Sequence, residues 1–361
     1  MKRINYLLVA IVLLFTACKC DTATKTPEQP QTPKNVIFMI GDGMGLAQVY
    51  AGMIANGNKL NLERSQCIGI AKTYSFNNYT TDSAAGGTAL ACGVKTKNGM
   101  IGMNPDSVAV NSILEVAENN GLATGIVVTC DVTHATPASF IAHQINRKME
   151  EEIAADFLKT DIDVFIGGGR KNFENRKDSV NLTEKLRENN YNIAYTIDEV
   201  KAVKSGKLAA LLYDEHPPIA SERGKMSPDA VMAAIDILKN NEKGFFLMIE
   251  GSQIDWAGHA NDYDYLISEM LDFDETIGRV FDWAEKDGNT LVVITADHET
   301  GGLSMPSGNI ADNISNTSFS TKNHSGIPVP VYAFGPGAEN FKGFMENIDI
   351  KGKIEKALNI K

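Results

Sequence analysis

Three apolar segments of the sequence each end in residues of the types that bind metal ions. In chain order they are 36–40 before Asp42, 245–249 before Glu250, Asp255 and His259, and 291–296 before Asp297 and His298. Carboxylates and imidazoles hold zinc and other divalent cations. In open parallel sheets, ligands bind at the carboxyl ends of the strands. We therefore expect three strands whose ends together form a multi-metal site.

Two of these residue pairs would reach an ion in different ways. Asp255 and His259 are four residues apart, which on a helix places both on one face, where they can share a zinc ion. A solvated helix pair is the alternative. Asp297 and His298 are adjacent, so a regular strand would point them to opposite faces. They converge only if the chain turns at the strand end, and a histidine satisfied within the core is the alternative.

Two further motifs combine a reactive side chain with small residues. Asp42 lies in Gly-Asp-Gly-Met-Gly, whose glycines allow close backbone approach to a ligand. Its spacing differs from the dinucleotide-binding pattern, so we interpret Asp42 as a metal ligand. Ser83 follows Asp82 in a small-residue run, which predicts a helix N-terminus that favours negative charge on the serine and on a phosphate. An ordinary capped helix is the alternative.

The segments that must position these residues alternate between strand and helix patterns. Apolar strand-like runs lie at 36–40, 124–129, 162–166, 208–213, 245–249, 291–296 and 329–334. Between them, stretches such as 108–120 and 262–287 carry apolar residues at helical spacing. We predict an α/β fold, a three-layer sandwich with a mostly parallel central sheet. Residues 307–325, rich in Ser, Asn, Thr and Gly, predict a long surface loop that brings His324 to the site.

Composition limits the classes of partner. The chain has 361 residues and a formal net charge of −11, so no nucleic acid is expected as a specific partner. An acidic protein still accepts an anionic substrate where metal ions reverse the local field. The five cysteines form no disulfide framework, and Cys92 and Cys130 lie in apolar contexts that predict buried thiols.

The N-terminus reads as an export segment. A basic start and an apolar run over 4–16 predict a signal peptide over 1–17, and the residues before Cys18 resemble a bacterial lipoprotein box. An ordinary cleaved signal is the alternative. Residues 18–34 contain three prolines and predict an extended tether, followed by the catalytic domain over 35–361. The expected location is the bacterial periplasm or cell envelope, with membrane attachment only through a lipid anchor at Cys18.

Five ordered motifs resemble those of the alkaline phosphatase family. They are Gly-Asp-Gly-Met-Gly (41–45), Thr-Asp-Ser-Ala-Ala (81–85), His-Ala-Thr-Pro-Ala (134–138), Glu-Gly-Ser-Gln-Ile-Asp (250–255) and Thr-Ala-Asp-His (295–298). A sixth segment, Phe-Ile-Gly-Gly-Gly-Arg (165–170), also resembles the family and is interpreted as a structural turn. The resemblance implies an alkaline-phosphatase-like fold over about residues 35–345 and hydrolysis of small-molecule phosphate monoesters through a phosphoserine.

The resemblance also implies a role for each matching residue. Two Zn²⁺ ions and one Mg²⁺ per chain are expected. The first zinc would be held by Asp255, His259 and His324, the second by Asp42, Asp297 and His298, and the magnesium by Asp42, Thr136 and Glu250. Ser83 would be the nucleophile, and Arg147, oriented by Asp82, would bind two phosphate oxygens. His143 and His216 are expected to be structural or surface residues. The sequence does not fix the oligomer, although the family commonly forms homodimers.

Two positions depart from the enterobacterial pattern of the family. His134 stands where that pattern has Asp, and Trp256 where it has Lys; both are assigned to substrate binding, and the pair resembles cold-adapted and marine members. The departures at 134 and 256 leave open how strongly the third metal site binds magnesium. Simple packing is the alternative for Trp256. One rival function is a phosphodiesterase on the same core, which Arg147 disfavours. Another is a sulfatase on that core, whose nucleophile motif, Cys or Ser followed by Pro and Arg, is absent around Ser83. The third is a phosphate-capturing lipoprotein without catalysis, which would have lost a ligand or the nucleophile.

Overall fold

A computed structural model describes residues 32–310 and 314–361. The expected signal peptide (1–17) and most of the expected tether (18–34) lie outside these residues. Within the described ranges, no helix is both long and apolar enough to cross a bilayer.

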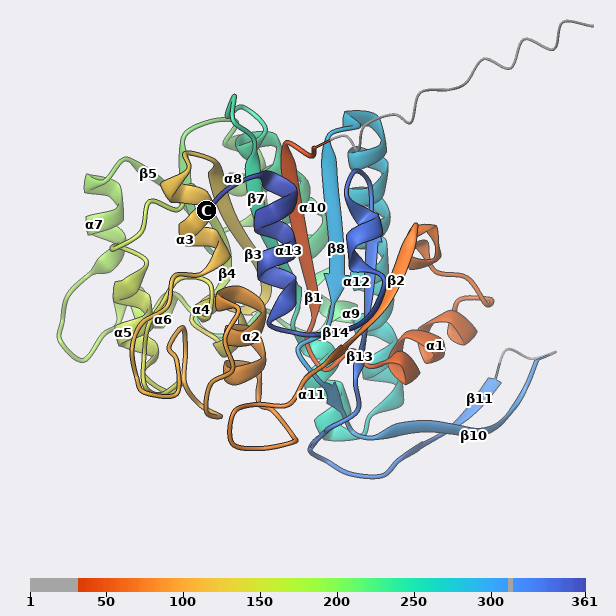
Figure 1. Ribbon diagram of the computed structural model, residues 1–361. Helices are drawn as coiled ribbons and strands as arrows, with labels where there is room; N and C mark the ends of the chain where they lie inside the picture. Colours follow the sequence, from red (N-terminus) through yellow and green to blue (C-terminus); the bar gives the residue numbers. More distant parts are fainter. Residues whose placement is uncertain (1–31, 311–313) are drawn as a thin grey trace, which may run out of the picture. The chain divides into compact units, whose positions relative to one another are not determined.

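All seven expected strand segments belong to one ten-stranded sheet, in the order β14-β2-β13-β8-β1-β7-β3-β4-β6-β5 (Figure 1). Only β13 runs antiparallel to its neighbours. The strands are β1 (Asn35–Gly41), β2 (Cys67–Lys72), β3 (Ala123–Asp131), β4 (Val164–Gly168), β5 (Tyr191–Ala194), β6 (Lys207–Leu211), β7 (Phe245–Gly251), β8 (Thr290–Thr295), β13 (Val329–Phe334) and β14 (Gly343–Glu346). Two small sheets pair β9 (Glu299–Thr300) with β12 (His324–Ser325) and β10 (Leu303–Asn309) with β11 (Ile314–Phe319).

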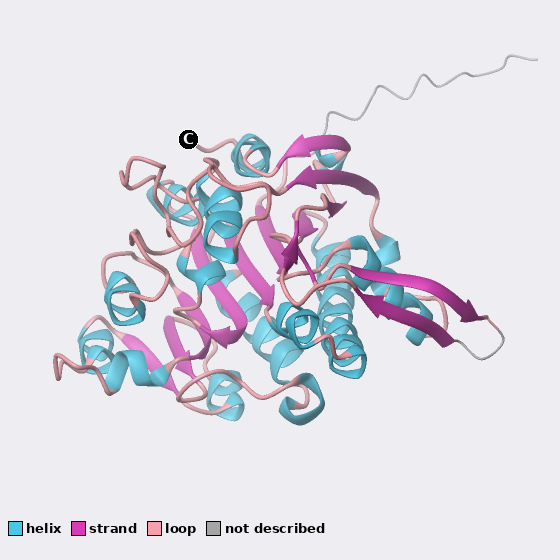
Figure 2. Ribbon diagram, turned by 90° about the horizontal axis from the view of Figure 1, so that it is seen from below, coloured by secondary structure: helices cyan, strands magenta, loops and turns pink. Residues whose placement is uncertain are grey.

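Helices cover both faces of the sheet and complete three layers (Figure 2). In Figure 1, α2, α3 and α13 lie in front of the sheet, and α10 and α12 lie behind it. The helices are α1 (Leu46–Ala55), α2 (Ser83–Cys92), α3 (Ile113–Asn119), α4 (Ala135–Ala138), α5 (Glu150–Asp156), α6 (Arg170–Glu174), α7 (Leu182–Glu188), α8 (Ile197–Ala202), α9 (Ala220–Arg223), α10 (Met226–Leu238), α11 (Gln253–Ala260), α12 (Tyr263–Asp287) and α13 (Asp349–Leu358), with short 3₁₀ turns at Asn61–Arg64 and Ala338–Phe341. The predicted α/β fold is confirmed.

Burial explains why these segments form these elements. The central strands β1, β7 and β8 are buried at every position, as continuous apolar runs are when helices cover both faces. Helix α12 begins where the Asp262 side chain accepts from the Tyr265 N–H, and it ends at Gly288 in the left-handed conformation. Its buried residues Leu266, Met270 and Phe273 follow helical spacing.

The prediction of a loop over 307–325 is wrong for most of its length. Strands β10 and β11 form an antiparallel hairpin that projects from the rest of the described chain (Figure 1). The side chains of 307–310 are exposed. The two strands satisfy their backbone hydrogen bonds by pairing with each other, and they bury no apolar face. Their sequence therefore lacks the alternation of apolar and polar residues that would have predicted strands. The helix expected over 108–120 begins only at Ile113, because Ser112 and Glu115 form a capping box.

The strand order brings the predicted site residues together. Strands β8, β1, β7 and β3 are consecutive in the sheet and parallel. The carboxyl ends of β8, β1 and β3 are followed by Asp297, Asp42 and His134, respectively. Glu250 is the next-to-last residue of β7. The carboxyl ends of these four strands therefore bring several of the predicted site residues together.

Candidate active site

Asp255, His259 and His324 form the first group of metal-ligand type. Helix α11 carries Asp255 and His259, while β12 brings His324 beside them. Nδ1 of His259 lies 2.6 Å from the Lys322 carbonyl, and Nδ1 of His324 lies 2.8 Å from the Thr81 carbonyl. Both Nδ1 atoms must donate, so in neutral rings both Nε2 atoms present lone pairs. These two Nε2 atoms are only 3.1 Å apart, an arrangement that needs a positive charge between them.

Asp42, Asp297 and His298 form the second group, which is completely buried. His298 Nε2 lies 3.4 Å from Asp42 Oδ1 and 3.2 Å from Asp297 Oδ2. Both carboxylate oxygens are buried without a hydrogen-bond partner. Burial, followed by the charge of Asp297, raises the pKa of Asp42 well above its ordinary value. Buried carboxylates with unpartnered oxygens are costly unless a cation binds them, so this donor set fits a metal ion.

Tight backbone geometry allows the first two groups to approach each other. Gly43 has φ +71°, and a Cβ there would lie 2.8 Å from the Asp255 Cα. Only glycine fits this turn, which sets Asp42 beside the residues from β8. Thr300 joins the groups, because its hydroxyl donates to Asp255 Oδ1 and lies 3.2 Å from His298 Nδ1. Thr300 was not predicted as a site residue; its position two residues after His298 was the available signal.

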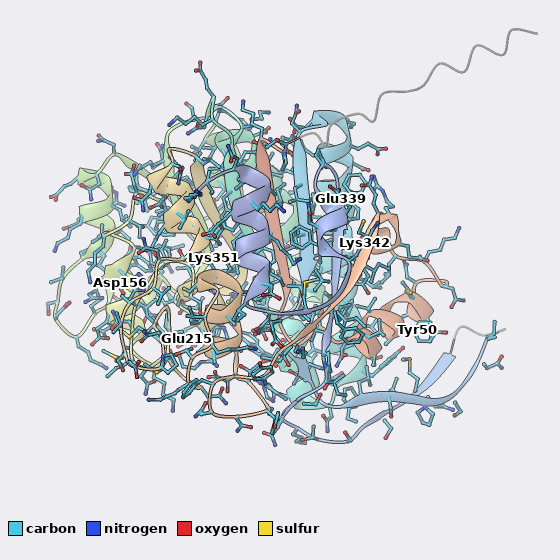
Figure 3. The ribbon with its side chains drawn as sticks, in the orientation of Figure 1. Tyr50, Asp156, Glu215, Glu339, Lys342 and Lys351 are labelled. Carbon is cyan, nitrogen blue, oxygen red and sulfur yellow. The ribbon has the colours of Figure 1, made fainter. Side chains whose placement is uncertain are left out.

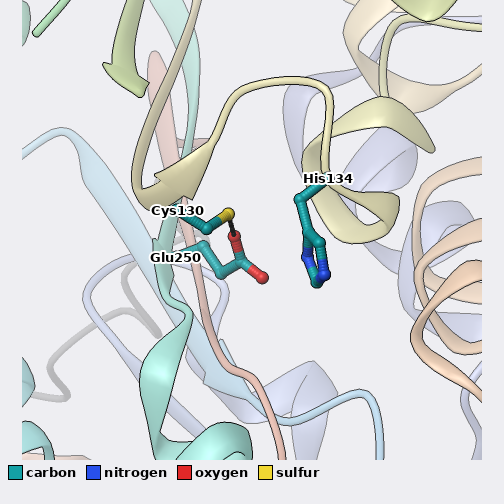
Figure 4. A group of neighbouring side chains, drawn as sticks. All are labelled: Cys130, His134 and Glu250. Carbon is teal, nitrogen blue, oxygen red and sulfur yellow. Dashed lines mark hydrogen bonds between the residues drawn. The ribbon is translucent and has the colours of Figure 1, made fainter. Parts of the chain in front are cut away.

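The third group contains Cys130, His134 and Glu250 (Figure 4). Cys130 Sγ lies 3.3 Å from Glu250 Oε2, and Ser252 Oγ donates to the same oxygen. Glu250 Oε1 has no partner, and burial raises the pKa of Glu250 to about 7. The thiol of Cys130 is buried, as predicted for it and for Cys92. Its proximity to His134 was not predicted.

Asp42 also connects the second and third groups. Its Oδ2 accepts from Thr136 Oγ1 at 3.3 Å, whereas its Oδ1 faces His298. One carboxylate therefore presents an oxygen to each side. The three atoms Asp42 Oδ2, Thr136 Oγ1 and the unpartnered Glu250 Oε1 are all oxygen ligands, the kind that magnesium prefers.

Ser83 is the first residue of α2 and lies beside the second group. Its Oγ is 3.3 Å from His298 Nε2, and the residue is 2% exposed. Asp82 caps the helix by accepting from the Ala85 N–H at 3.0 Å. The same carboxylate accepts from Arg147 Nη1 at 3.2 Å through Oδ2. The guanidinium is thus held near Ser83, at the positive end of the helix dipole.

His134 connects Arg147 to the aromatic side of the site. Arg147 Nη2 lies 3.3 Å from His134 Nε2, and a guanidinium only donates, so Nε2 accepts. Burial, followed by the charge of Arg147, lowers the pKa of His134 to about 3. The ring is therefore neutral with its proton on Nδ1, which is buried without a hydrogen-bond partner. Trp256 packs edge-on against His134, with ring centroids 6.0 Å apart.

The two remaining histidines differ from each other. His143 lies away from the three groups, between the Gly102 carbonyl at 2.7 Å and Glu115 at 3.0 Å, a structural position of the predicted kind. His216 is exposed but packs against Trp256, with centroids 4.6 Å apart. Its contact with a site residue was not predicted, since nothing in the sequence near 216 marks it.

The profile of the alkaline phosphatase family matches residues 33–311. The chain belongs to the alkaline phosphatase family. Alkaline phosphatase 4 of Bacillus subtilis (strain 168) is 35% identical over 90% of this chain and 88% of its own length. Alkaline phosphatase of Escherichia coli (strain K12) is 30% identical over 91% and 86%.

Solved alkaline phosphatase structures share the fold. That of the Antarctic bacterium TAB5 is 43% identical with a TM-score of 0.87, covering 92% of this chain and all of that chain (100%). That of a cold-active enzyme from a psychrophilic Shewanella sp. is 31% identical with a TM-score of 0.84, covering 90% and 99%. The resemblance to cold-adapted members is confirmed. This alkaline phosphatase hydrolyses phosphate monoesters by the family's metal-dependent route through a phosphoserine.

Proposed function

We propose that this protein is an exported, zinc-dependent phosphomonoesterase with Ser83 as its nucleophile. The observation that carries the proposal is the position of Ser83 Oγ, 3.3 Å from His298 Nε2 and next to a group with two unpartnered buried carboxylate oxygens. Arg147, 25% exposed at its side chain, provides the guanidinium for a dianionic monoester. That guanidinium disfavours the phosphodiesterase alternative, and the absence of a sulfatase nucleophile motif around Ser83 disfavours a sulfatase. No predicted ligand is missing from the chain.

Two zinc ions and one magnesium ion fit the donors available. Asp255, His259 and His324 would hold one zinc, and Asp42, Asp297 and His298 the other, since imidazole with carboxylate suits zinc. Asp42, Thr136 and Glu250 would hold magnesium. When bound, the zinc ions supply the positive charge that activates the serine hydroxyl and the hydrolytic water.

The chain's own residues then account for the remaining steps. Ser83 Oγ would attack the phosphorus, and the alcohol would leave on the opposite side. The backbone N–H groups at the start of α2 and the Arg147 guanidinium would stabilise the charge on the equatorial oxygens. Asp82 holds Arg147 in place through its Oδ2. Water then hydrolyses the phosphoserine, and two successive inversions give net retention at phosphorus.

His134 and Trp256 are proposed to tune this site. His134 Nε2 accepts from Arg147, and the buried Nδ1 carries the proton, so the ring offers a cation no free lone pair. A His-to-Asp variant of the Antarctic enzyme has been solved with magnesium bound in its M3 site. We propose that His134 weakens magnesium binding in this chain. Trp256 would leave phosphate without the ammonium that the enterobacterial pattern supplies.

Export, lipidation at Cys18 and a catalytic domain over 35–361 are proposed from the sequence pattern at the N-terminus. Dimerisation is proposed from the family's common assembly. An apolar groove of about 540 Å³ is lined by residues that include Leu46, Tyr50 and Ile327, with exposed fractions of 61%, 52% and 55%. A second copy that covers this groove would remove its apolar surface from water. Light scattering with Tyr50→Glu, compared with the native chain, tests this: the variant should be monomeric.

The proposed function is tested by hydrolysis of a phosphate monoester and a phosphodiester at alkaline pH, before and after chelation. We expect monoester turnover that a chelator abolishes and that zinc restores, with far slower diester turnover. Activity that persists at full strength after complete removal of metal would contradict zinc dependence. Equal turnover of the two esters would contradict the monoesterase assignment.

A further inference from the structure

The segment 213–217, named here the 213–217 loop, lies beside the proposed phosphate site. The proposed mechanism assigns no function to it. It connects β6 to the short turn before α9 and carries His216. The Asp131 N–H, at the end of β3, donates to His216 Nδ1 at 3.0 Å. This bond fixes the plane of the imidazole. The ring then meets the Trp256 indole edge-to-face, with centroids 4.6 Å apart and an interplanar angle of 66°.

His134, His216 and Trp256 form a three-ring cluster. His134 lies 6.0 Å from each of the other two rings, at interplanar angles of 89° and 83°. Every pair is edge-to-face, the favourable arrangement for aromatic rings. Because His134 Nε2 accepts from Arg147, the orientation of the cluster bears on the guanidinium that binds phosphate.

The glycine motif at 165–170 holds the 213–217 loop in place. The Gly169 N–H donates to the Glu215 carbonyl at 2.8 Å, and the Arg170 N–H donates to the Tyr213 carbonyl at 3.0 Å. Gly169 has φ +92°, and a Cβ there would lie 1.8 Å from Asp131 Oδ1. At Gly168, a Cβ would lie 1.9 Å from the Glu215 carbonyl oxygen. A side chain at Gly168 would displace the loop at Glu215, and one at Gly169 would displace the Asp131 carboxylate.

Two further contacts tie the loop to the site from other sides. Arg170 Nε donates to Asp214 at 2.8 Å. Gln253, three residues before Trp256, donates to the Pro217 carbonyl at 2.9 Å and to the Thr129 carbonyl at 2.8 Å. The loop is therefore attached to β3, to the glycine motif and to the helix that carries Trp256.

We propose that His216 is a positioning residue for phosphate binding, held by Asp131 and the glycine motif so that its ring fixes Trp256 and His134 beside Arg147. The inference rests on the proposed function only in taking Arg147 as the phosphate ligand. In this proposal the Gly-Gly-Gly-Arg segment positions the 213–217 loop, which is more than the structural turn that the sequence predicted.

The test uses His216→Ala in full-length, zinc-loaded enzyme. Trp283→Phe in all variants makes Trp256 the single tryptophan, since the chain has two. Acrylamide quenching reports the freedom of Trp256, and competition by inorganic phosphate reports its binding. We expect stronger quenching and a phosphate inhibition constant raised about two- to tenfold, the range of one aromatic pair contact, with KM for the monoester rising in parallel.

Matched variants separate the contributions. His216→Asn keeps an acceptor for the Asp131 N–H but no ring, and His216→Phe keeps a ring but no acceptor; neither should restore both readouts. Glu215→Ala, a loop neighbour marked in Figure 3 whose carboxylate pairs with Lys171 at 3.0 Å, should resemble the native enzyme. The proposal is overturned if His216→Ala matches Glu215→Ala in both readouts, or if Asn or Phe alone restores them. If the native enzyme lacks monoesterase activity, the proposed function fails, while quenching still tests the positioning.

Discussion

Ser83 Oγ lies 3.3 Å from His298 Nε2, so a hydroxyl at a helix N-terminus directly contacts a group of metal-ligand type. The His298 ring is held from its other side by Thr300 at 3.2 Å. Burial, followed by the charge of His324, lowers the pKa of His298 well below its ordinary value. The neutral ring keeps its Nε2 lone pair toward the serine and the two carboxylates.

Removing Asp255 should deplete the first zinc. Asp255→Ala deletes a buried anion that lies 3.4 Å from both His259 Nε2 and His324 Nε2. Partners outside the ligand sphere alone contribute about 10- to 100-fold to metal affinity, so the loss should exceed that. Zinc per chain, measured by elemental analysis after dialysis, should fall. The exposed Asp264→Ala is the control, and an undiminished zinc content in Asp255→Ala would refute the ligand assignment.

Trp256→Lys should tighten product binding. An ammonium adds a charge-assisted contact to phosphate, worth about 1.5–3 kcal/mol, so the inhibition constant of phosphate should fall roughly tenfold or more. If product release limits turnover, kcat should fall as well. Phosphate inhibition is measured at fixed zinc and magnesium. Equal constants in the two enzymes would mean that Trp256 only packs beside the site.

His134→Asp should strengthen magnesium binding at the site of Asp42, Thr136 and Glu250. The substitution replaces a buried imidazole beside Glu250 with a carboxylate, which suits a hard cation better. We expect magnesium to be retained at about tenfold lower free concentration, the effect of one charged contact. Magnesium content at a series of buffered concentrations measures it, with zinc content as the control. An unchanged magnesium curve would show that His134 does not limit that site.

Cys18→Ser should release the enzyme from the membrane while its catalytic domain stays active. Several acyl chains anchor a protein stably, whereas one is marginal. Cell fractionation with activity measurements locates the native protein and the variant. A native protein found in the soluble fraction, with an unmodified N-terminus beyond residue 18, would exclude the anchor.

Some site residues could be predicted from the sequence and others could not. The apolar runs before Asp42 and Asp297 marked strand ends, because a buried parallel strand leaves a continuous pattern. His324 was expected at the site, but the β10–β11 hairpin before it was not predicted, since its strands carry no apolar alternation. The sequence did not predict the positions of His216, Cys130 and Thr300 at the site, because each reaches the site through a contact between distant segments. Such contacts follow from strand order, which local periodicity does not encode.

The central claim is that phosphate passes through Ser83, and covalent trapping of labelled phosphate tests it most directly. Native enzyme and Ser83→Ala, both loaded with zinc, are mixed with a labelled monoester and quenched in acid. We predict covalent label on the peptide containing Ser83 in the native enzyme, and none in Ser83→Ala at unchanged zinc content, since no ligand of the first group is removed. Label that remains covalently bound to Ser83→Ala would contradict the account.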